Sequence, residues 1–78
     1  MRVPRTKFLV GETKDSRVEM EAQYVRKDGN HNVYSVQIDG RKYEFTVGRL
    51  GELHSTRDNR SVGSFMPNDG KRLRVWMP

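Results

Sequence analysis

Two arginines and a tryptophan alternate near the end of the chain, in the run Arg72-Leu73-Arg74-Val75-Trp76. On an extended strand, Arg72, Arg74 and Trp76 project from one face, because successive side chains point to opposite sides. Two guanidinium groups beside an indole can hold a phosphate backbone and stack a base, or can anchor a protein partner. A second interpretation is that Trp76 closes the core and that the arginines only flank it.

Residues 52–57 contain the side-chain types that general acid–base chemistry requires. On an extended segment, Glu52 and His54 share a face, and a nearby arginine such as Arg57 can neutralise a phosphate. A carboxylate, an imidazole and a guanidinium are what a metal-free ribonuclease needs. The same residue types occur in any polar loop. The sequence therefore predicts a protein that is not an enzyme, with this nuclease as the lesser alternative.

The chain is basic, and its charge is concentrated at the two ends. Its 78 residues carry 15 basic and 10 acidic side chains, for a net charge of +5. Residues 1–11 hold three bases and no acid, and residues 49–78 hold six bases and three acids. If the first and last strands pair, these two ends form one basic surface. Excess charge that serves only solubility is the competing interpretation.

Arginine outnumbers lysine by ten to five. The planar arginine group forms paired hydrogen bonds with phosphate and stacks on rings, but arginine is equally enriched where proteins bind proteins. The predicted partner is therefore nucleic acid, DNA or RNA, or an acidic protein surface. The candidate binding residues are Arg2, Arg5, Lys7, Arg49, Arg57, Arg60, Lys71, Arg72, Arg74 and Trp76.

The absence of cysteine excludes disulfide frameworks, cysteine-based zinc sites and thiol nucleophiles. With only two histidines in addition, we expect no metal and no cofactor. The longest apolar run, Phe8–Val10, is far shorter than the roughly 20 residues of a membrane span or the roughly 7–15 of a signal-peptide core. The sequence thus predicts a cytoplasmic protein without a membrane partner, and its initial Met1 predicts a complete small gene product.

The length predicts one small basic β domain, residues 1–78, because domains usually contain roughly 100–150 residues. Valine and isoleucine together number ten, against one alanine and four leucines, and this composition favours strands. Leucine, isoleucine, valine and phenylalanine total only seventeen, so the expected core is thin. No stretch of a dozen residues has the apolar spacing of an amphipathic helix.

The clearest element is a hairpin over residues 32–47, which turns at Asp39-Gly40. A two-residue turn favours these residues because its backbone needs positive φ. The aromatic residues of the two strands then share one face, and we interpret them as core residues and not as a base-stacking platform. The turn predicts the opposing pairs Ile38–Arg41, Val36–Tyr43 and Tyr34–Phe45.

Residues 18–24 alternate in the same way and extend this hairpin to a three-stranded meander. A three-residue loop with Gly29 in the left-handed region joins the strands and predicts Ala22 opposite Tyr34. A further strand is expected over residues 6–10.

Turn residues at 67–71 predict a second hairpin, which joins residues 62–66 to residues 72–77. Leu73 and Val75 are expected to face the core. The register of this hairpin predicts the opposing pairs Phe65–Leu73 and Gly63–Val75.

The segment 48–61 is the least regular part of the sequence, because Leu50 and Leu53 are its only large apolar side chains. A structureless loop of this length is unusual in so small a domain. We expect either a short strand over residues 52–56 or a mobile functional loop.

Five to six short antiparallel strands in 78 residues predict an all-β fold, a small closed or half-closed barrel of SH3-like or OB-like type, because closure removes unpaired edges. A strongly curved sheet that dimerises through one face is the alternative, so the protein is a monomer or a homodimer. The expected function is that of a basic, non-enzymatic protein that contacts the nucleic-acid backbone through an Arg-rich β surface. The alternative is a small virus-type inhibitor of a host or partner protein, such as a nucleic-acid-processing enzyme.

Overall fold

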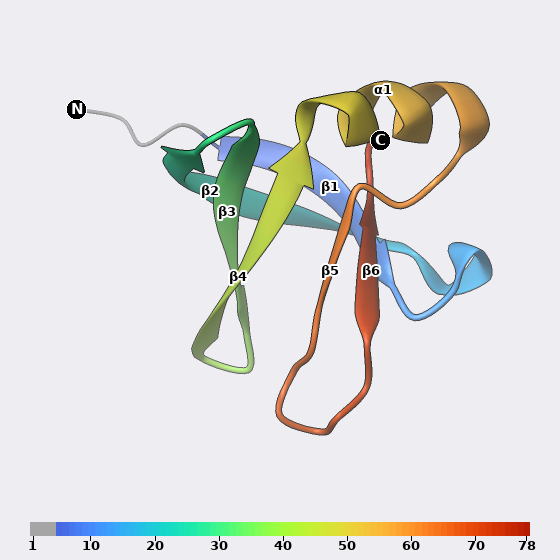
Figure 1. The fold of residues 1–78 in the computed structure, drawn as a ribbon. Coiled ribbons are helices and arrows are strands. Elements are labelled where there is room, and N and C mark those ends of the chain that lie inside the picture. Colours follow the sequence, from blue (N-terminus) through green and yellow to red (C-terminus); the bar gives the residue numbers. More distant parts are fainter. Residues whose placement is uncertain (1–4) are drawn as a thin grey trace.

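The structure is a computed structural model that describes residues 5–78, and the side chains of residues 6–78 (Figure 1). Six strands, one α-helix and one short 3-10 helix follow one another along the described chain. In chain order these elements are β1 Arg5–Gly11, η1 Lys14–Ser16, β2 Val18–Asp28, β3 His31–Ile38, β4 Arg41–Gly48, α1 Arg49–Asp58, β5 Gly63–Phe65 and β6 Leu73–Trp76.

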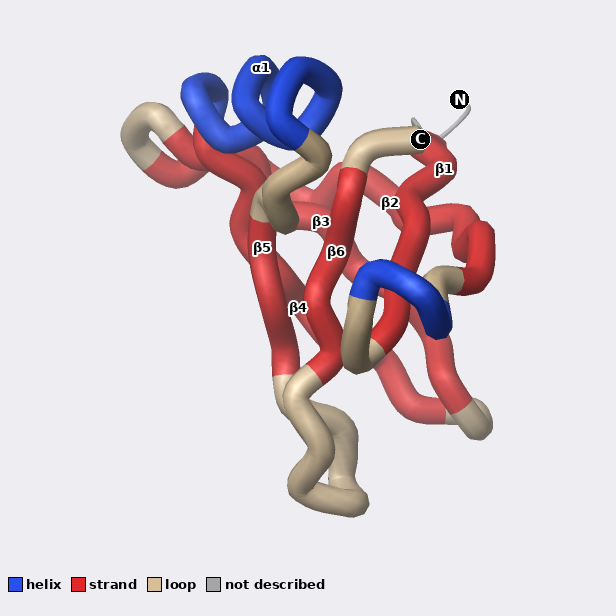
Figure 2. Tube along the Cα trace, turned by 90° about the vertical axis from the view of Figure 1, so that its right-hand side faces the viewer, coloured by secondary structure: helices blue, strands red, loops and turns tan. Residues whose placement is uncertain are grey.

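The strands form one sheet in the order β4-β3-β2-β1-β6-β5, and all neighbouring strands are antiparallel. The first strand therefore lies beside the last. The two ends of the order, β4 and β5, pack against each other, so that the sheet nearly closes into a barrel. The predicted small all-β barrel is confirmed. Figure 2 shows α1 across one end of this barrel, close to the C-terminus.

The β3–β4 hairpin has all three predicted pairs. Asp39 and Gly40 form its turn with φ values of 52° and 79°, the positive values that such a turn requires. Phe45 is buried, and Tyr34 and Tyr43 are half-buried and pack against the same apolar cluster. The predicted core role of these three aromatic residues is confirmed.

The β2–β3 register differs by two residues from the predicted one, since Gln23 lies opposite Ser35. The connection is a two-residue turn at 29–30 and not a three-residue loop, although Gly29 has the expected positive φ, 62°. A β-bulge at residues 24–26 then changes the β2–β3 register once more along the strands. Because a shift of two residues keeps each side chain on its face, Met20 and Ala22 of β2 still pack in the barrel.

The β5–β6 hairpin has the predicted pairs, although both strands are shorter than expected. Gly70 in its connecting loop has a φ of 78°. The strand expected over residues 6–10 is present as β1, which pairs with β2 on one side and with β6 on the other.

Valine and phenylalanine fill the interior of the barrel. Across the β4–β5 closure, the ring centroids of Phe45 and Phe65 are 5.8 Å apart. A Cβ on Gly63 would lie 2.5 Å from the carbonyl oxygen of Thr46, so the close approach of β5 to β4 requires glycine there. The buried cluster consists of Phe8, Val10, Ala22, Val36, Phe45, Val47, Phe65 and Val75.

Both expectations for the segment 48–61 are wrong, because residues 49–58 form the helix α1. The helix begins after Gly48, which is extended. It ends at Asn59, whose φ of 59° is left-handed and whose N–H donates to the carbonyl of Ser55 at 3.0 Å. A left-handed asparagine is a common way to end a helix.

The apolar periodicity that usually reveals a helix is missing from α1, since its two leucines face solvent. Leu50 is 72% exposed and Leu53 is 56% exposed. The helix is attached instead through Ser55, which is buried and whose Oγ accepts the N–H of Met77 at 2.9 Å. Within residues 5–78, no helix is long and apolar enough to cross a membrane.

Candidate functional site

The pairing of β1 with β6 joins the first and last strands, which is the condition that the sequence analysis set for a common basic surface. Trp76 lies opposite Leu9, and Arg74 lies opposite Gly11. Val75, between the two, is fully buried inside the barrel. Because side chains alternate along a strand, Arg74 and Trp76 point to the outer face of the sheet.

The indole of Trp76 lies on this outer face, but it is not free. Trp76 is only 4% exposed, and the guanidinium carbon of Arg17 lies 5.4 Å from the centre of its ring. The same guanidinium donates from Nη1 to Oδ1 of Asn59 at 3.0 Å. The prediction of an exposed indole beside the arginines is therefore wrong. Its burial agrees with the second interpretation, although Trp76 is outside the cluster that fills the barrel.

Arg17 covers the indole through weak contacts. A cation–π contact at a partly exposed site contributes about 0.5–1 kcal/mol, and one ordinary hydrogen bond contributes about 0.5–1.5 kcal/mol. Arg17 is itself only partly buried. The guanidinium can thus leave the ring of Trp76 at a cost of about 1–2.5 kcal/mol.

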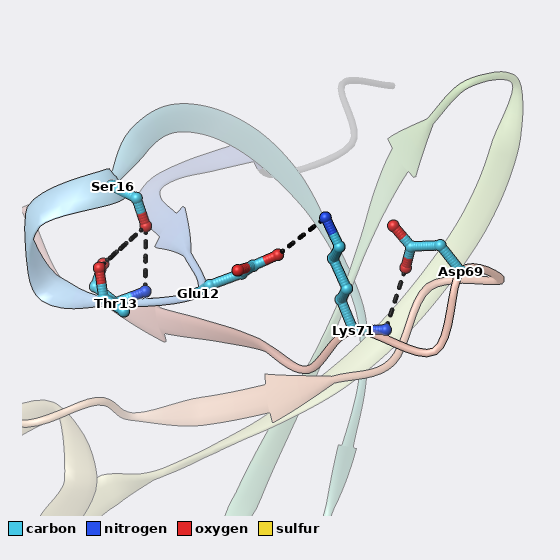
Figure 3. Close-up of polar contacts among 5 residues, drawn as sticks. All are labelled: Glu12, Thr13, Ser16, Asp69 and Lys71. Carbon is cyan, nitrogen blue, oxygen red and sulfur yellow. Dashed lines mark hydrogen bonds and ion pairs between the residues drawn. The ribbon is translucent and has the colours of Figure 1, made fainter.

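Arg17 follows a tight turn, in which Figure 3 shows the contacts between Thr13 and Ser16. The N–H of Thr13 donates to Oγ of Ser16 at 3.0 Å, and the N–H of Ser16 donates to the carbonyl of Thr13 at 3.2 Å. The turn packs directly on Gly11, where a Cβ would lie 2.6 Å from the carbonyl oxygen of Ser16. Glycine at this position allows the chain to fold back against β1.

An open hollow of about 570 Å³ lies beside the indole, and we call it the Trp76 hollow. Lys14, Arg60 and Arg74 are exposed at this hollow. None of the three forms an ion pair within the part of the chain that the structure describes. The lining residues are Glu12, Thr13, Lys14, Asn59, Arg60, Ser61, Arg74 and Trp76.

Among the described lining residues, Glu12 is the only acid, and it forms an ion pair with Lys71, which lies outside the hollow. Its Oε1 lies 3.5 Å from Nζ of Lys71, as Figure 3 shows. The backbone N–H of Lys71 donates to Oδ1 of Asp69 at 3.1 Å, which fixes the start of this lysine in its loop. The Trp76 hollow therefore keeps an excess of positive charge.

The other described candidates do not line this hollow. Lys7 is exposed on β1, and its Nζ lies 3.5 Å from Oε1 of Glu19. Arg49 lines a separate hollow at the start of α1. Arg57 lies in the last turn of α1, and Arg72 lies just before β6; both are exposed.

Two further candidates cannot be placed at the hollow. Arg2 lies outside the described residues, and Arg5 begins β1 with a side chain that lies outside them. Of the ten predicted binding residues, the structure brings together Arg60, Arg74 and Trp76 at one hollow.

Sequence reasoning missed Lys14 and Arg17, which lie between β1 and β2. Residues 12–28 contain five acids and four bases, so this stretch gave no sign of a basic surface. Only the turn at residues 12–17 places these two side chains beside β6. The one signal in the sequence was the run of turn-forming residues around Thr13 and Ser16.

His54 lies on α1, and the geometry expected for a nuclease is absent. Residues two positions apart do not share a helix face, so the expected common face of Glu52 and His54 is wrong. Nδ1 of His54 lies 3.4 Å from Oδ2 of Asp58, one helical turn later, and both side chains are partly exposed. Within residues 5–78, no group of three histidine, aspartate or glutamate side chains is placed to hold a metal ion.

Comparison with protein-family models, with curated protein sequences and with solved structures found no match to this chain.

Proposed function

We propose that the protein is a non-enzymatic binding protein that contacts the phosphate backbone of nucleic acid through the Trp76 hollow. The observation that carries the proposal is the set of exposed cations around the hollow, Lys14, Arg60 and Arg74, which form no ion pair in the described chain. Paired cations, such as Lys7, lose part of their attraction for a ligand to their own carboxylate partner. The cations of the hollow keep their attraction for a ligand, because they form no ion pair in the described chain.

The remaining lining residues suit the same ligand. The hydroxyl groups of Thr13 and Ser61 can donate hydrogen bonds to phosphate oxygens, which take half or more of the hydrogen bonds in protein–DNA interfaces. The hollow is open to solvent, so an extended chain can cross it. Contacts of this kind provide affinity and little sequence specificity.

Salt dependence tests the proposal. Fluorescence anisotropy of a labelled oligonucleotide, measured between about 50 and 200 mM salt, gives the number of phosphates that the protein neutralises. In the Arg60→Ala/Arg74→Ala double variant, the slope of log affinity against log salt should fall by about 1.5–2. Absence of binding at low salt would refute the proposal.

The matched control removes the same charge elsewhere. Lys27 on β2 and Lys42 on β4 are exposed, lie outside the Trp76 hollow and form no ion pair in the described chain. The Lys27→Ala/Lys42→Ala variant should keep the slope of the unmodified protein. An equal loss of slope in both double variants would show that net charge, and not this hollow, attracts the oligonucleotide.

One observation favours the second candidate function, that of a small inhibitor of another protein. Leu50 and Leu53 lie three positions apart on α1, so they neighbour each other on the exposed surface of the helix. Exposed leucines of this kind are typical of a surface that binds protein. A Leu50→Lys/Leu53→Lys variant that loses a defined protein partner, while its oligonucleotide binding is unchanged, would support this function over the first.

A further inference from the structure

Trp76 is the single tryptophan of the chain, and its position on the outer face is unusual for a side chain of this size. Its ring borders the Trp76 hollow, only 4% of the residue is exposed, and the guanidinium of Arg17 lies over the ring. Arg17 reaches this face of the ring from the turn at residues 12–17. The guanidinium of Arg17 also donates a hydrogen bond to Oδ1 of Asn59.

We infer that Trp76 is a stacking site for an unpaired nucleobase, and that Arg17 occupies this site until a base replaces it. The inference rests on the proposed function, because the cations of the hollow must first hold the nucleic-acid backbone. An aromatic base offers the ring of Trp76 a flat π surface of the same kind that the planar guanidinium offers it now. The ligand class is single-stranded nucleic acid, since the bases of a duplex are already stacked.

The spacing of the residues fits one nucleotide. Arg74 and Trp76 are two positions apart on the same face of β6, which separates them by roughly 7 Å along the strand. This distance is comparable to the span from a base to its own phosphate. The hollow, at about 570 Å³, also lies within the range of roughly 300–1,000 Å³ that small-ligand sites occupy.

After a base displaces it, the guanidinium of Arg17 can still contact the bound nucleic acid. Arg17 is tethered beside Lys14, so after leaving the ring it remains close to the bound backbone. There it can form the paired hydrogen bonds with phosphate that arginine favours. Exchange of the guanidinium for a base therefore replaces a cation–π contact by a stacking contact and adds a phosphate contact.

The test uses two oligonucleotides with the same phosphates, one of thymidines and one of abasic sites, and reads the fluorescence of Trp76. Because no other tryptophan is present, the signal reports this site alone. The thymidine strand should quench the fluorescence and bind more tightly than the abasic strand, by up to roughly thirtyfold, which is the value of one stacked base less the cost of moving Arg17. The abasic strand should bind with a similar salt slope and leave the fluorescence unchanged.

The variant Asn59→Gly loosens the cover without disturbing the helix end. Glycine tolerates the left-handed conformation of residue 59, and it removes the acceptor of the Arg17 hydrogen bond. In this variant, acrylamide should quench Trp76 more strongly, and affinity for the thymidine strand should rise roughly two- to tenfold, the worth of one hydrogen bond. Because Asn59 also lines the hollow, the readout is the ratio of the two affinities, which should rise in favour of the thymidine strand.

The outcomes separate the two proposals. Equal affinities for both strands, without quenching, would overturn the stacking site and leave the phosphate interface standing. Failure of both strands to bind would overturn the phosphate interface, and the stacking site with it. An Asn59→Gly variant that binds the thymidine strand more weakly would show that Arg17 supports the site and does not cover it.

Discussion

Alanine at Gly63 tests the contact that closes the barrel. In the structure, a Cβ at this position would lie 2.5 Å from the carbonyl oxygen of Thr46 and 3.8 Å from Cδ2 of Phe45. Ordinary van der Waals contact begins at 3.4 Å, so β5 must move away from β4 by about 0.9 Å. The obstacle is a backbone carbonyl of β4, which cannot move aside as a flexible side chain would.

Two costs follow from this displacement. Overpacking of a tight contact typically costs about 1–3 kcal/mol. The ring of Phe65 also loses part of its stacking on Phe45 and Tyr43, whose centroids lie 5.8 and 5.9 Å away, and such aromatic pairs contribute about 0.5–1.5 kcal/mol. Alanine also lowers the conformational entropy of the unfolded chain relative to glycine, which stabilises the folded protein by about 0.4–1 kcal/mol. The expected net loss in the free energy of unfolding is about 2–3 kcal/mol, or about 10–20 °C in Tm.

Urea unfolding at room temperature, followed by circular dichroism and by the fluorescence of Trp76, measures this loss. Gly51→Ala is the matched control, because its Cβ would meet the carbonyl oxygen of Val62 at an ordinary 3.6 Å. It lies inside α1, where alanine is favoured over glycine by about 0.8–1 kcal/mol, so this variant should be more stable than the unmodified protein. A Gly63→Ala protein within about 0.5 kcal/mol of the unmodified one would refute the tight closure.

Two further substitutions test how the surroundings of Trp76 are held. Ser55→Ala removes the acceptor of the Met77 N–H, and the unsatisfied donor should lower the free energy of unfolding by about 1–2 kcal/mol in a urea titration; a neutral result would show that other contacts hold α1. Gly11→Ala places a Cβ 2.6 Å from the carbonyl oxygen of Ser16, which should cost about 1–3 kcal/mol and increase acrylamide quenching of Trp76. Quenching equal to that of the unmodified protein would show that the turn at residues 12–17 does not position Arg17.

Strands and turns were predictable because their signals are local. Asp39 and Gly40 determine both the turn and the register of the β3–β4 hairpin, and the alternating pattern agrees with them. The β2–β3 connection was harder, since a bulge at residues 24–26 absorbs a residue without leaving a mark in the apolar pattern. The prediction kept the correct face there and missed the register.

The helix and the covered indole were not predictable, because both depend on single polar contacts between distant segments. A hydrogen bond from the N–H of Met77 to Oγ of Ser55 helps to attach α1, and the two leucines of the helix are exposed. Arg17 meets Trp76 and Asn59 across 59 and 42 positions of the chain. The spacing of apolar residues in the sequence carries no information on contacts of this kind. The sequence could therefore indicate the outer face of β6 but not what covers it.

The position of Trp76 is itself an argument that the hollow serves a ligand. With only seventeen large aliphatic and phenylalanine residues, the chain has little apolar surface to bury, yet its one tryptophan is buried outside the cluster that fills the barrel. The interior is filled by valine and phenylalanine instead, and the indole lies outside under a cation that two weak contacts hold. Proteins depart from the most stabilising arrangement chiefly at functional sites. The placement of this ring outside the barrel, beside three cations that form no ion pair in the described chain, is the departure on which the proposed site rests.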